Sequence, residues 1–308
     1  MSVEPKKPSL VSLSDLSSDD VRSLVHLSRD IKLNFSKGIR EPLLAGRVMA
    51  LLFEKPSLRT RISFESLMTH MGGVSLVLGQ DTGWGKREPI KDFIPILSSY
   101  VDLIVARTMK HETLLEIIEH SSCTVINGLT DWCHPCQALA DLLTAFENFG
   151  SFDFVKVAYV GDANNVARSL AIGCAKLGLD FTIACPQDYH FEESEIAELN
   201  DASTATIRQT TDPVEAVEHS TVVYTDVWTS MGQEAENEKR LNDFAPFQVN
   251  QTLMSHASDN AIFMHCLPAR RGEEVTAEVI DGPQSRIIQQ AENRLHAQKG
   301  LVYWLMDL

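Results

Sequence analysis

Short apolar runs alternate with helical patterns through the first half of the chain. The runs predict strands at residues 47–53, 74–78, 102–106 and 124–127. After the first run, apolar residues at the i, i+3, i+4 and i+7 spacing of a helix are Phe64, Leu67, Met68 and Met71. Gly72-Gly73 is a plausible end for that helix, and a second helix is expected over 135–149. Gly150-Ser151 then indicates a domain boundary.

The second half repeats this alternation. Strands are expected at residues 156–160, 181–185, 221–225 and 261–265. A helix is expected between Gly161 and Gly178, and a last helix places one mostly apolar face on Ala291, Leu295, Gln298, Val302 and Leu305. Strands that alternate with helices predict an α/β fold of two doubly wound, largely parallel sheets.

Several residues whose side chains are suited to binding or catalysis come shortly after the expected strands. They are Ser57, Arg107, His134, Asn165, Asp226 and Cys266. In open α/β sheets, ligands bind at the carboxyl ends of the strands. Two such domains facing each other are therefore expected to form an active-site cleft between them.

Charge and composition exclude several classes of partner. The 308 residues carry a formal net charge of −15, which repels nucleic acid and anionic lipid. No apolar run approaches the roughly 18 residues of a membrane span. The first 20 residues mix acids and lysines and lack the pattern of a targeting segment. We therefore expect a cytoplasmic protein, with its six cysteines reduced.

The segment Ser57-Leu58-Arg59-Thr60-Arg61 lies where a strand gives way to a helix. The start of a helix offers free N–H groups and positive dipole charge, and arginine adds a donor fork that matches phosphate oxygens. A capped helix with solvated arginines is the alternative interpretation.

The segment Cys133-His134-Pro135-Cys136-Gln137 allows three interpretations. Two cysteines before a helix are typical of a thiol–disulfide site, but such sites belong to small separate domains. Cysteine and histidine together also suggest zinc, although a second ligand pair at short spacing is missing. The third interpretation is a binding site that uses His134 and Gln137. Elsewhere, the turn at Gly161 lacks the three glycines of a dinucleotide fingerprint, which argues against NAD.

These motifs, taken in order from about Leu10 to Met306, resemble those of the aspartate and ornithine carbamoyltransferases. The resemblance implies that Ser57, Arg59 and Thr60 bind the phosphate of carbamoyl phosphate, with Arg61 in or near the site. Leu58, where the family often has threonine, would contribute only its backbone N–H. The residues that would contact the carbamoyl group are Arg107, His134, Gln137 and Arg294.

In the second half, the loop Asp226-Val227-Trp228-Thr229-Ser230-Met231-Gly232 resembles the substrate loop of the ornithine branch. It implies that the amino acid is bound by Asn165, Asp226, Ser230 and Met231. In His265-Cys266-Leu267-Pro268, Cys266 also favours the ornithine branch, and Cys266 and Leu267 would line the junction of the two substrates. The catalytic set implied by the resemblance is Arg107, His134, Cys266 and Arg294.

The resemblance implies transfer of a carbamoyl group to the δ-amine of L-ornithine, without metal or organic cofactor, by a homotrimer. Residues 1–150 and the last helix, about 288–308, would bind carbamoyl phosphate, and 151–287 would bind ornithine. Putrescine, N-acetylornithine or aspartate as the acceptor, a thiol–disulfide oxidoreductase, and a non-catalytic subunit are the alternatives. One departure is Gly83, where many relatives have glutamine in a loop that reaches a neighbouring subunit.

Overall fold

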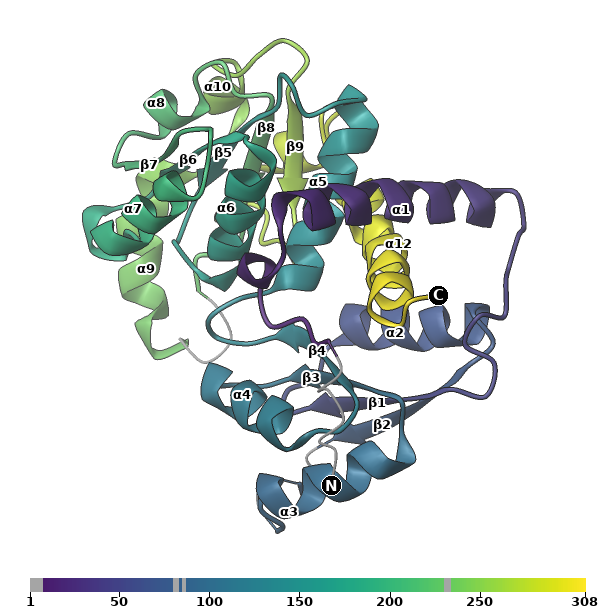
Figure 1. The fold of residues 1–308 in the computed structure, drawn as a ribbon. Coiled ribbons are helices and arrows are strands. Elements are labelled where there is room, and N and C mark those ends of the chain that lie inside the picture. The colour runs from purple at the N-terminus through teal and green to yellow at the C-terminus, as the bar shows by residue number, and fades with distance from the viewer. Residues whose placement is uncertain (1–7, 80–82, 85–86, 230–233) are drawn as a thin grey trace. The chain divides into compact units, whose positions relative to one another are not determined.

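The computed structural model describes residues 8–79, 83–84, 87–229 and 234–308 (Figure 1). Contacts divide the chain into two compact units. Unit 1 is Met1–Leu139 with Arg294–Leu308, and unit 2 is Ala140–Asn293. The division falls inside two helices, α5 (Pro135–Phe149) and α12 (Ile287–Leu305). No helix within the described ranges is long and apolar enough to cross a membrane.

Unit 1 contains a parallel sheet in the order β2-β1-β3-β4. Its strands are β1 (Val48–Phe53), β2 (Val74–Gly79), β3 (Leu103–Arg107) and β4 (Thr124–Leu129). Its other helices are α1 (Ser18–Ser36), α2 (Leu58–His70), α3 (Ile90–Tyr100) and α4 (His111–His120). Phe53 pairs with Arg107, so β1 and β3 end at the same edge of the sheet. The expected strands of the first half are confirmed to within two residues at their ends.

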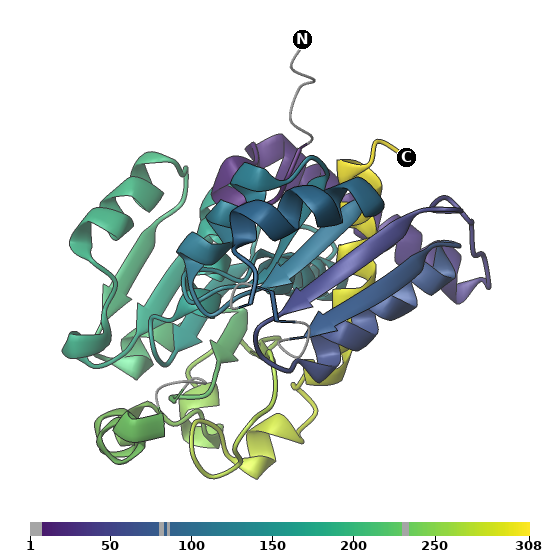
Figure 2. The same ribbon diagram turned by 90° about the horizontal axis from the view of Figure 1, so that it is seen from below.

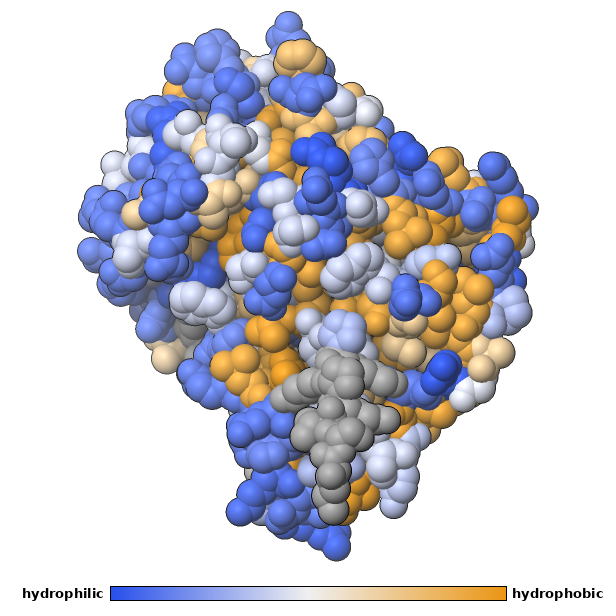
Figure 3. Space-filling view, viewed as in Figure 1, coloured by the Kyte–Doolittle hydropathy of each residue, from blue (hydrophilic) through white to orange (hydrophobic). Residues whose placement is uncertain are grey.

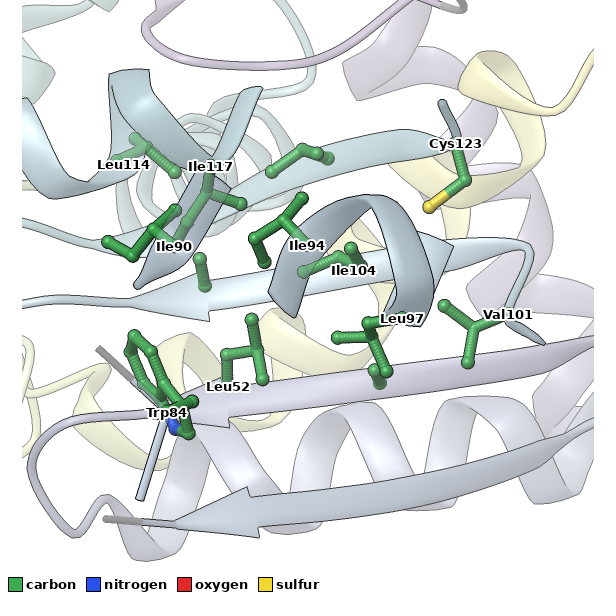
Figure 4. Close-up of a cluster of buried hydrophobic side chains, with 13 residues drawn as sticks. Leu52, Trp84, Ile90, Ile94, Leu97, Val101, Ile104, Leu114, Ile117 and Cys123 are labelled. Atoms are coloured by element: carbon green, nitrogen blue, oxygen red, sulfur yellow. The ribbon is translucent and has the colours of Figure 1, made fainter. Parts of the chain in front are cut away.

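One face of this sheet packs against α3 and α4. Ile94 and Leu97 on α3 meet Leu52 and Ile104 from β1 and β3, and all of them are buried (Figure 4). Both faces of β1 are buried, which explains why its sequence is a continuous apolar run and does not alternate.

Unit 2 contains a parallel sheet in the order β7-β6-β5-β8-β9. Its strands are β5 (Lys156–Val160), β6 (Asp180–Ala184), β7 (Ile207–Thr210), β8 (Val222–Thr225) and β9 (Ile262–His265). Its helices are α6 (Asn165–Leu177), α7 (Glu193–Asp201), α8 (Pro213–Val217), α9 (Asn237–Phe244), α10 (Gln251–Met254) and α11 (Ala277–Ile280). Gly178 ends α6 with a left-handed φ of 72°, as its sequence position predicts.

The sequence pattern missed β7. This strand lies at the edge of its sheet, and only Ile207 of its four residues is buried. A short edge strand with a polar majority lacks the apolar run that marks its neighbours.

The end of α12 that belongs to unit 1 lies between α1 and α2 (Figures 1 and 2). Gly300 makes the approach to α1 possible. A Cβ at this position would lie 2.3 Å from Ser28 Oγ and 3.3 Å from Ser28 Cα. Ser28 is buried, and its hydroxyl donates to Leu24 O at 2.6 Å. The two helix backbones therefore meet at a contact that leaves no room for a methyl group.

We predict that Gly300→Ala lowers the free energy of unfolding by about 1–2 kcal/mol. Overpacking costs roughly 1–3 kcal/mol, whereas the better helix propensity of alanine returns at most about 1 kcal/mol. Urea unfolding followed by circular dichroism measures the difference. Adding Ser28→Ala removes the oxygen of the closest contact, and the double variant should recover most of the loss. A Gly300→Ala protein as stable as the wild type would show that α1 and α12 do not pack this closely.

Candidate active site

The N-terminus of α2 presents donors at the edge of the unit 1 sheet. Ser57 is the N-cap residue, yet its side chain makes no hydrogen bond to the helix. The first-turn amides therefore lack a side-chain cap and remain available to an anion. Arg59 stands in this turn, half-buried, and its guanidinium forms no ion pair with the described residues. Leu58 is 72% exposed, so its side chain faces solvent.

A residue from the far end of the chain completes this helix start. Arg294 on α12 donates from Nη2 to Thr60 Oγ1 at 2.7 Å. Thr60 is fully buried, and Arg294 is 5% exposed. This hydrogen bond joins residues 234 positions apart. It fixes a buried guanidinium beside the helix start that sequence analysis assigned to phosphate.

Arg107 and His134 are two more buried groups in unit 1. Together with the start of α2 and Arg294, they are called the unit 1 half-site. Arg107 ends β3, and His134 comes directly before α5. Burial, together with the charges of Arg294 and Arg107, lowers the pKa of His134 well below its ordinary value of 6.5. The imidazole is therefore neutral near pH 7 and keeps one N–H to donate. Gln137, in the first turn of α5, is also buried.

The two cysteines around His134 are packed as structural thiols. Cys133 and Cys136 are buried, and Cys136 Sγ donates to Asn127 O at 3.4 Å. Burial raises the pKa of Cys136 to about 12, although the charge of Arg294 acts in the opposite direction. Thiol exchange needs the thiolate, so this environment opposes redox chemistry.

Unit 2 holds a carboxylate at the end of β8. Asp226 is 7% exposed. Its Oδ2 accepts from Asn164 Nδ2 at 3.1 Å, and its Oδ1 accepts from Val227 N at 2.8 Å and Cys266 Sγ at 3.1 Å. No Lys, Arg or His of the described ranges forms an ion pair with it. Buried carboxylates normally have a cationic partner, so the absence of one among the described residues makes Asp226 a candidate for binding a cationic group of a ligand.

The loop that carries Cys266 and Leu267 is anchored by a buried pair. His265 and Glu274 are both fully buried, and His265 Nε2 lies 3.1 Å from Glu274 Oε1. Leu267 N donates to His265 Nδ1 at 2.9 Å, and Arg270 N also donates to Glu274. The loop contains a positive φ of 60° at Leu267 and a cis Leu267-Pro268 bond.

Asp226, His265 and Cys266 form the one group in the described residues whose ligand atoms lie close enough for a metal ion. His265 does not suit that role, because Nδ1 accepts a backbone N–H and Nε2 lies on Glu274. Without the imidazole, two ligands remain, which is fewer than structural or catalytic zinc sites use. Cys133 and Cys136 belong to no such group among the described residues.

The structure places the sequence-predicted residues in two half-sites. Unit 1 holds Ser57, Leu58, Arg59, Thr60, Arg107, His134, Gln137 and Arg294, and unit 2 holds Asn165, Asp226, Cys266 and Leu267. Ser230 and Met231 lie outside the described residues.

Sequence analysis missed two positioning residues. The first is Asn164, which caps α6 and hydrogen-bonds Asp226, while the role of its neighbour Asn165 stays a prediction. An asparagine just before a helix is the signal that could have found Asn164. The second is Glu274, which lies among charged residues that resemble a solvated surface.

Gly83 has a conformational reason to be glycine. Its φ is +80°, and a Cβ there would lie 3.0 Å from Arg87 Cβ. A glutamine at this position would be strained in the backbone conformation that this chain adopts.

Comparison with known proteins matches both halves of the chain. Residues 8–147 match the carbamoyl-P binding domain of aspartate/ornithine carbamoyltransferases, and residues 153–305 match their Asp/Orn binding domain. The ornithine carbamoyltransferase of Bacillus subtilis (strain 168) is 51% identical over 299 residues, which cover 95% of this chain and 92% of the relative.

Comparison with solved structures also finds ornithine carbamoyltransferases. The crystallographic neighbour titled ornithine carbamoyltransferase from Pyrococcus furiosus has a TM-score of 0.93 and 45% identity, covering 97% of this chain and 96% of its own. The Campylobacter jejuni anabolic enzyme has a TM-score of 0.91 and 35% identity, covering 97% and 99%. With both domain models matched and half of its residues shared with a full-length relative, the chain belongs to the aspartate/ornithine carbamoyltransferase family.

Proposed function

We propose that the protein transfers the carbamoyl group of carbamoyl phosphate to the δ-amine of L-ornithine, giving L-citrulline and phosphate. The observation that carries the choice of acceptor is Asp226, a buried carboxylate with no cationic partner among the described residues. An α-ammonium supplies that partner. Relatives that share 45–51% of their residues with this chain over nearly its whole length carry the name ornithine carbamoyltransferase.

Carbamoyl phosphate suits the half-site of unit 1. Its phosphate accepts hydrogen bonds from the first-turn amides of α2 and the Ser57 hydroxyl, and it pairs with the guanidinium of Arg59. Arg107, His134 and Arg294 then surround the carbamoyl group. A hydrogen-bond donor aimed at the oxygen that gains negative charge in the tetrahedral intermediate lowers the activation free energy by about 3–4 kcal/mol. The low pKa of His134 suits this role, because it keeps the imidazole a neutral hydrogen-bond donor.

The reaction needs a neutral δ-amine, whose free pKa is about 10.4, as in lysine. The amine nitrogen attacks the carbamoyl carbon and forms the new C–N bond. The bond from that carbon to the phosphate oxygen then breaks, and the departing phosphate takes the amine proton. This sequence requires no protein base. Cys266, whose thiol donates to Asp226, stands beside the amino-acid site and orients that carboxylate.

The homotrimer is also part of the proposal. Exposed apolar side chains gather on α2 and β2 at Leu58, Ile62, Val74 and Leu76, with exposures of 72%, 51%, 57% and 45%. A cavity of about 540 Å³ beside them is lined by Ser57, Leu58 and Val77, among others. Leu58 and Ile62 expose apolar side chains one helical turn apart on α2, Leu58 lines this cavity, and exposed apolar surface is typical of protein interfaces. A role in arginine biosynthesis agrees with the word anabolic in the names of relatives, and a cytoplasmic location stays a prediction.

The acceptor is tested by comparing L-ornithine, putrescine, N-acetylornithine and aspartate, with the carbamoylated product of each assayed. We expect a strong preference for ornithine. Asp226→Asn keeps the shape but loses the charge, so it should lower kcat/KM for ornithine by roughly 10–100-fold, the equivalent of one hydrogen bond to a charged group. A preference for putrescine would contradict the role of Asp226 while leaving the carbamoyl phosphate half-site intact.

The cysteines separate carbamoyl transfer from redox chemistry. We predict that the double variant Cys133→Ser and Cys136→Ser keeps kcat/KM within about threefold of the wild type, a change below ~0.7 kcal/mol in the barrier. Serine hydroxyls reach the partners that the thiols have, Val11 O and Asn127 O. Thermal unfolding checks that the variant is folded. Loss of transfer in a folded variant would give the thiols a role in the reaction.

A further inference from the structure

Outside the half-sites, one aromatic ring of unit 1 gathers several groups that carry or accept positive charge. Phe35 lies near the end of α1. The Cζ atom of Arg40 lies 3.2 Å from its ring centroid, and Nζ of Lys299 lies 4.2 Å from it. The His70 ring lies 5.0 Å away, centroid to centroid. Four segments contribute here: α1, the connection after it, the end of α2, and α12.

The ammonium of Lys299 is the unusual member of this cluster. Lys299 is 4% exposed, and no ion pair within the described ranges includes Arg40, His70 or Lys299. A buried charge without a counter-ion is costly, and a cation–π contact offsets only about 1–2 kcal/mol of that cost. Burial and the charge of Arg40 lower the pKa of Lys299 to about 8. Burial, followed by Lys299 and Arg40, also lowers the pKa of His70.

These side chains line a cavity. Its volume is about 60 Å³, and its walls include Ile31, Phe35, Arg40, His70, Lys299 and Tyr303. One water needs at least ~10–15 Å³ of such space, so the cavity admits a few waters or one small oxyanion and excludes a nucleotide. Glu41, the one carboxylate in the walls, is exposed and forms no ion pair with the cluster. Figure 3 shows that the surface between α12 and the α1–β1 connection is largely apolar.

We propose that this cavity binds a small oxyanion of the size of inorganic phosphate, held by Lys299 and Arg40 with His70 beside them. The anion supplies the negative partner that the described residues do not provide. The site is separate from the start of α2. His70 ends that helix of 13 residues, and the twelve steps of about 1.5 Å between its first and last residues place its two ends about 18 Å apart.

The test follows the reactivity of the Lys299 amine. The full-length protein is labelled with trace acetic anhydride across a pH series, and labelling of each lysine is measured by mass spectrometry. In sodium chloride, Lys299 should label with a midpoint near pH 8. A bound anion favours the charged amine, so inorganic phosphate at matched ionic strength should raise the midpoint by about one unit or more. That shift corresponds to a fall of roughly fivefold in labelling at pH 8.

Three controls make the result decisive. Lys156, which is exposed and lies 3.7 Å from Asp180, should label equally in both salts. Arg40→Gln should abolish the phosphate effect at Lys299. Arg59→Gln, which weakens the phosphate position at the other end of α2, should leave that effect in place. Equal labelling of Lys299 in phosphate and chloride would overturn the proposal, and so would an effect that is lost in Arg59→Gln but kept in Arg40→Gln.

Discussion

The half-site for carbamoyl phosphate depends on one buried hydrogen bond, from Arg294 to Thr60. It brings a guanidinium from the last helix to the first turn of α2, where uncapped amides already favour an anion. The positive charge assembled there has a second effect, because it joins burial in keeping His134 neutral. In the proposed function, the same group of residues attracts the phosphate and keeps a neutral hydrogen-bond donor for the carbamoyl oxygen. Close packing of α12 on α1 at Gly300 supports the helix that carries Arg294.

The half-site in unit 2 has the opposite charge. Asp226 is oriented by hydrogen bonds from Asn164, Val227 and Cys266, and we propose that it binds the α-ammonium of the substrate. Glu274 acts one step further away, by holding His265 and with it the loop of Cys266. The proposed anion site in one unit and the proposed ammonium site in the other agree with the carbamoyl-P binding and Asp/Orn binding domains that the two halves of the chain match.

Much of the fold was predictable because most of its strands, though not the edge strands β2 and β7, are buried on both faces. Such strands appear as continuous apolar runs, and α5 was predicted at its observed bounds for the similar reason that its apolar spacing is regular. The edge strand β7 escaped because three of its four residues are not buried. Among the site residues, Ser57 and Arg59 form a local pattern that the sequence displays directly. Long-range contacts were different: family resemblance placed Arg294 and Thr60 in the same site, but the hydrogen bond between them leaves no local signal and was not predicted.

The cluster around Phe35 shows the same limit. Arg40, His70 and Lys299 are unremarkable residues in the sequence, and only the packing of α1, the connection after it, α2 and α12 brings them together. Asn164 was missed for a smaller reason. Two adjacent asparagines follow β5, and the sequence does not tell which of them caps the helix and which begins it.

The central claim is that unit 1 binds carbamoyl phosphate with its own residues and unit 2 supplies the amino-acid site. The most direct test is calorimetric titration with carbamoyl phosphate in the absence of ornithine, on the wild type, Arg294→Gln and Asp226→Asn. We predict binding to the wild type, a Kd raised at least about tenfold in Arg294→Gln because a hydrogen bond from a charged group is lost, and a Kd unchanged within about twofold in Asp226→Asn. Unchanged binding in Arg294→Gln, or an equal loss in Asp226→Asn, would contradict this division of roles.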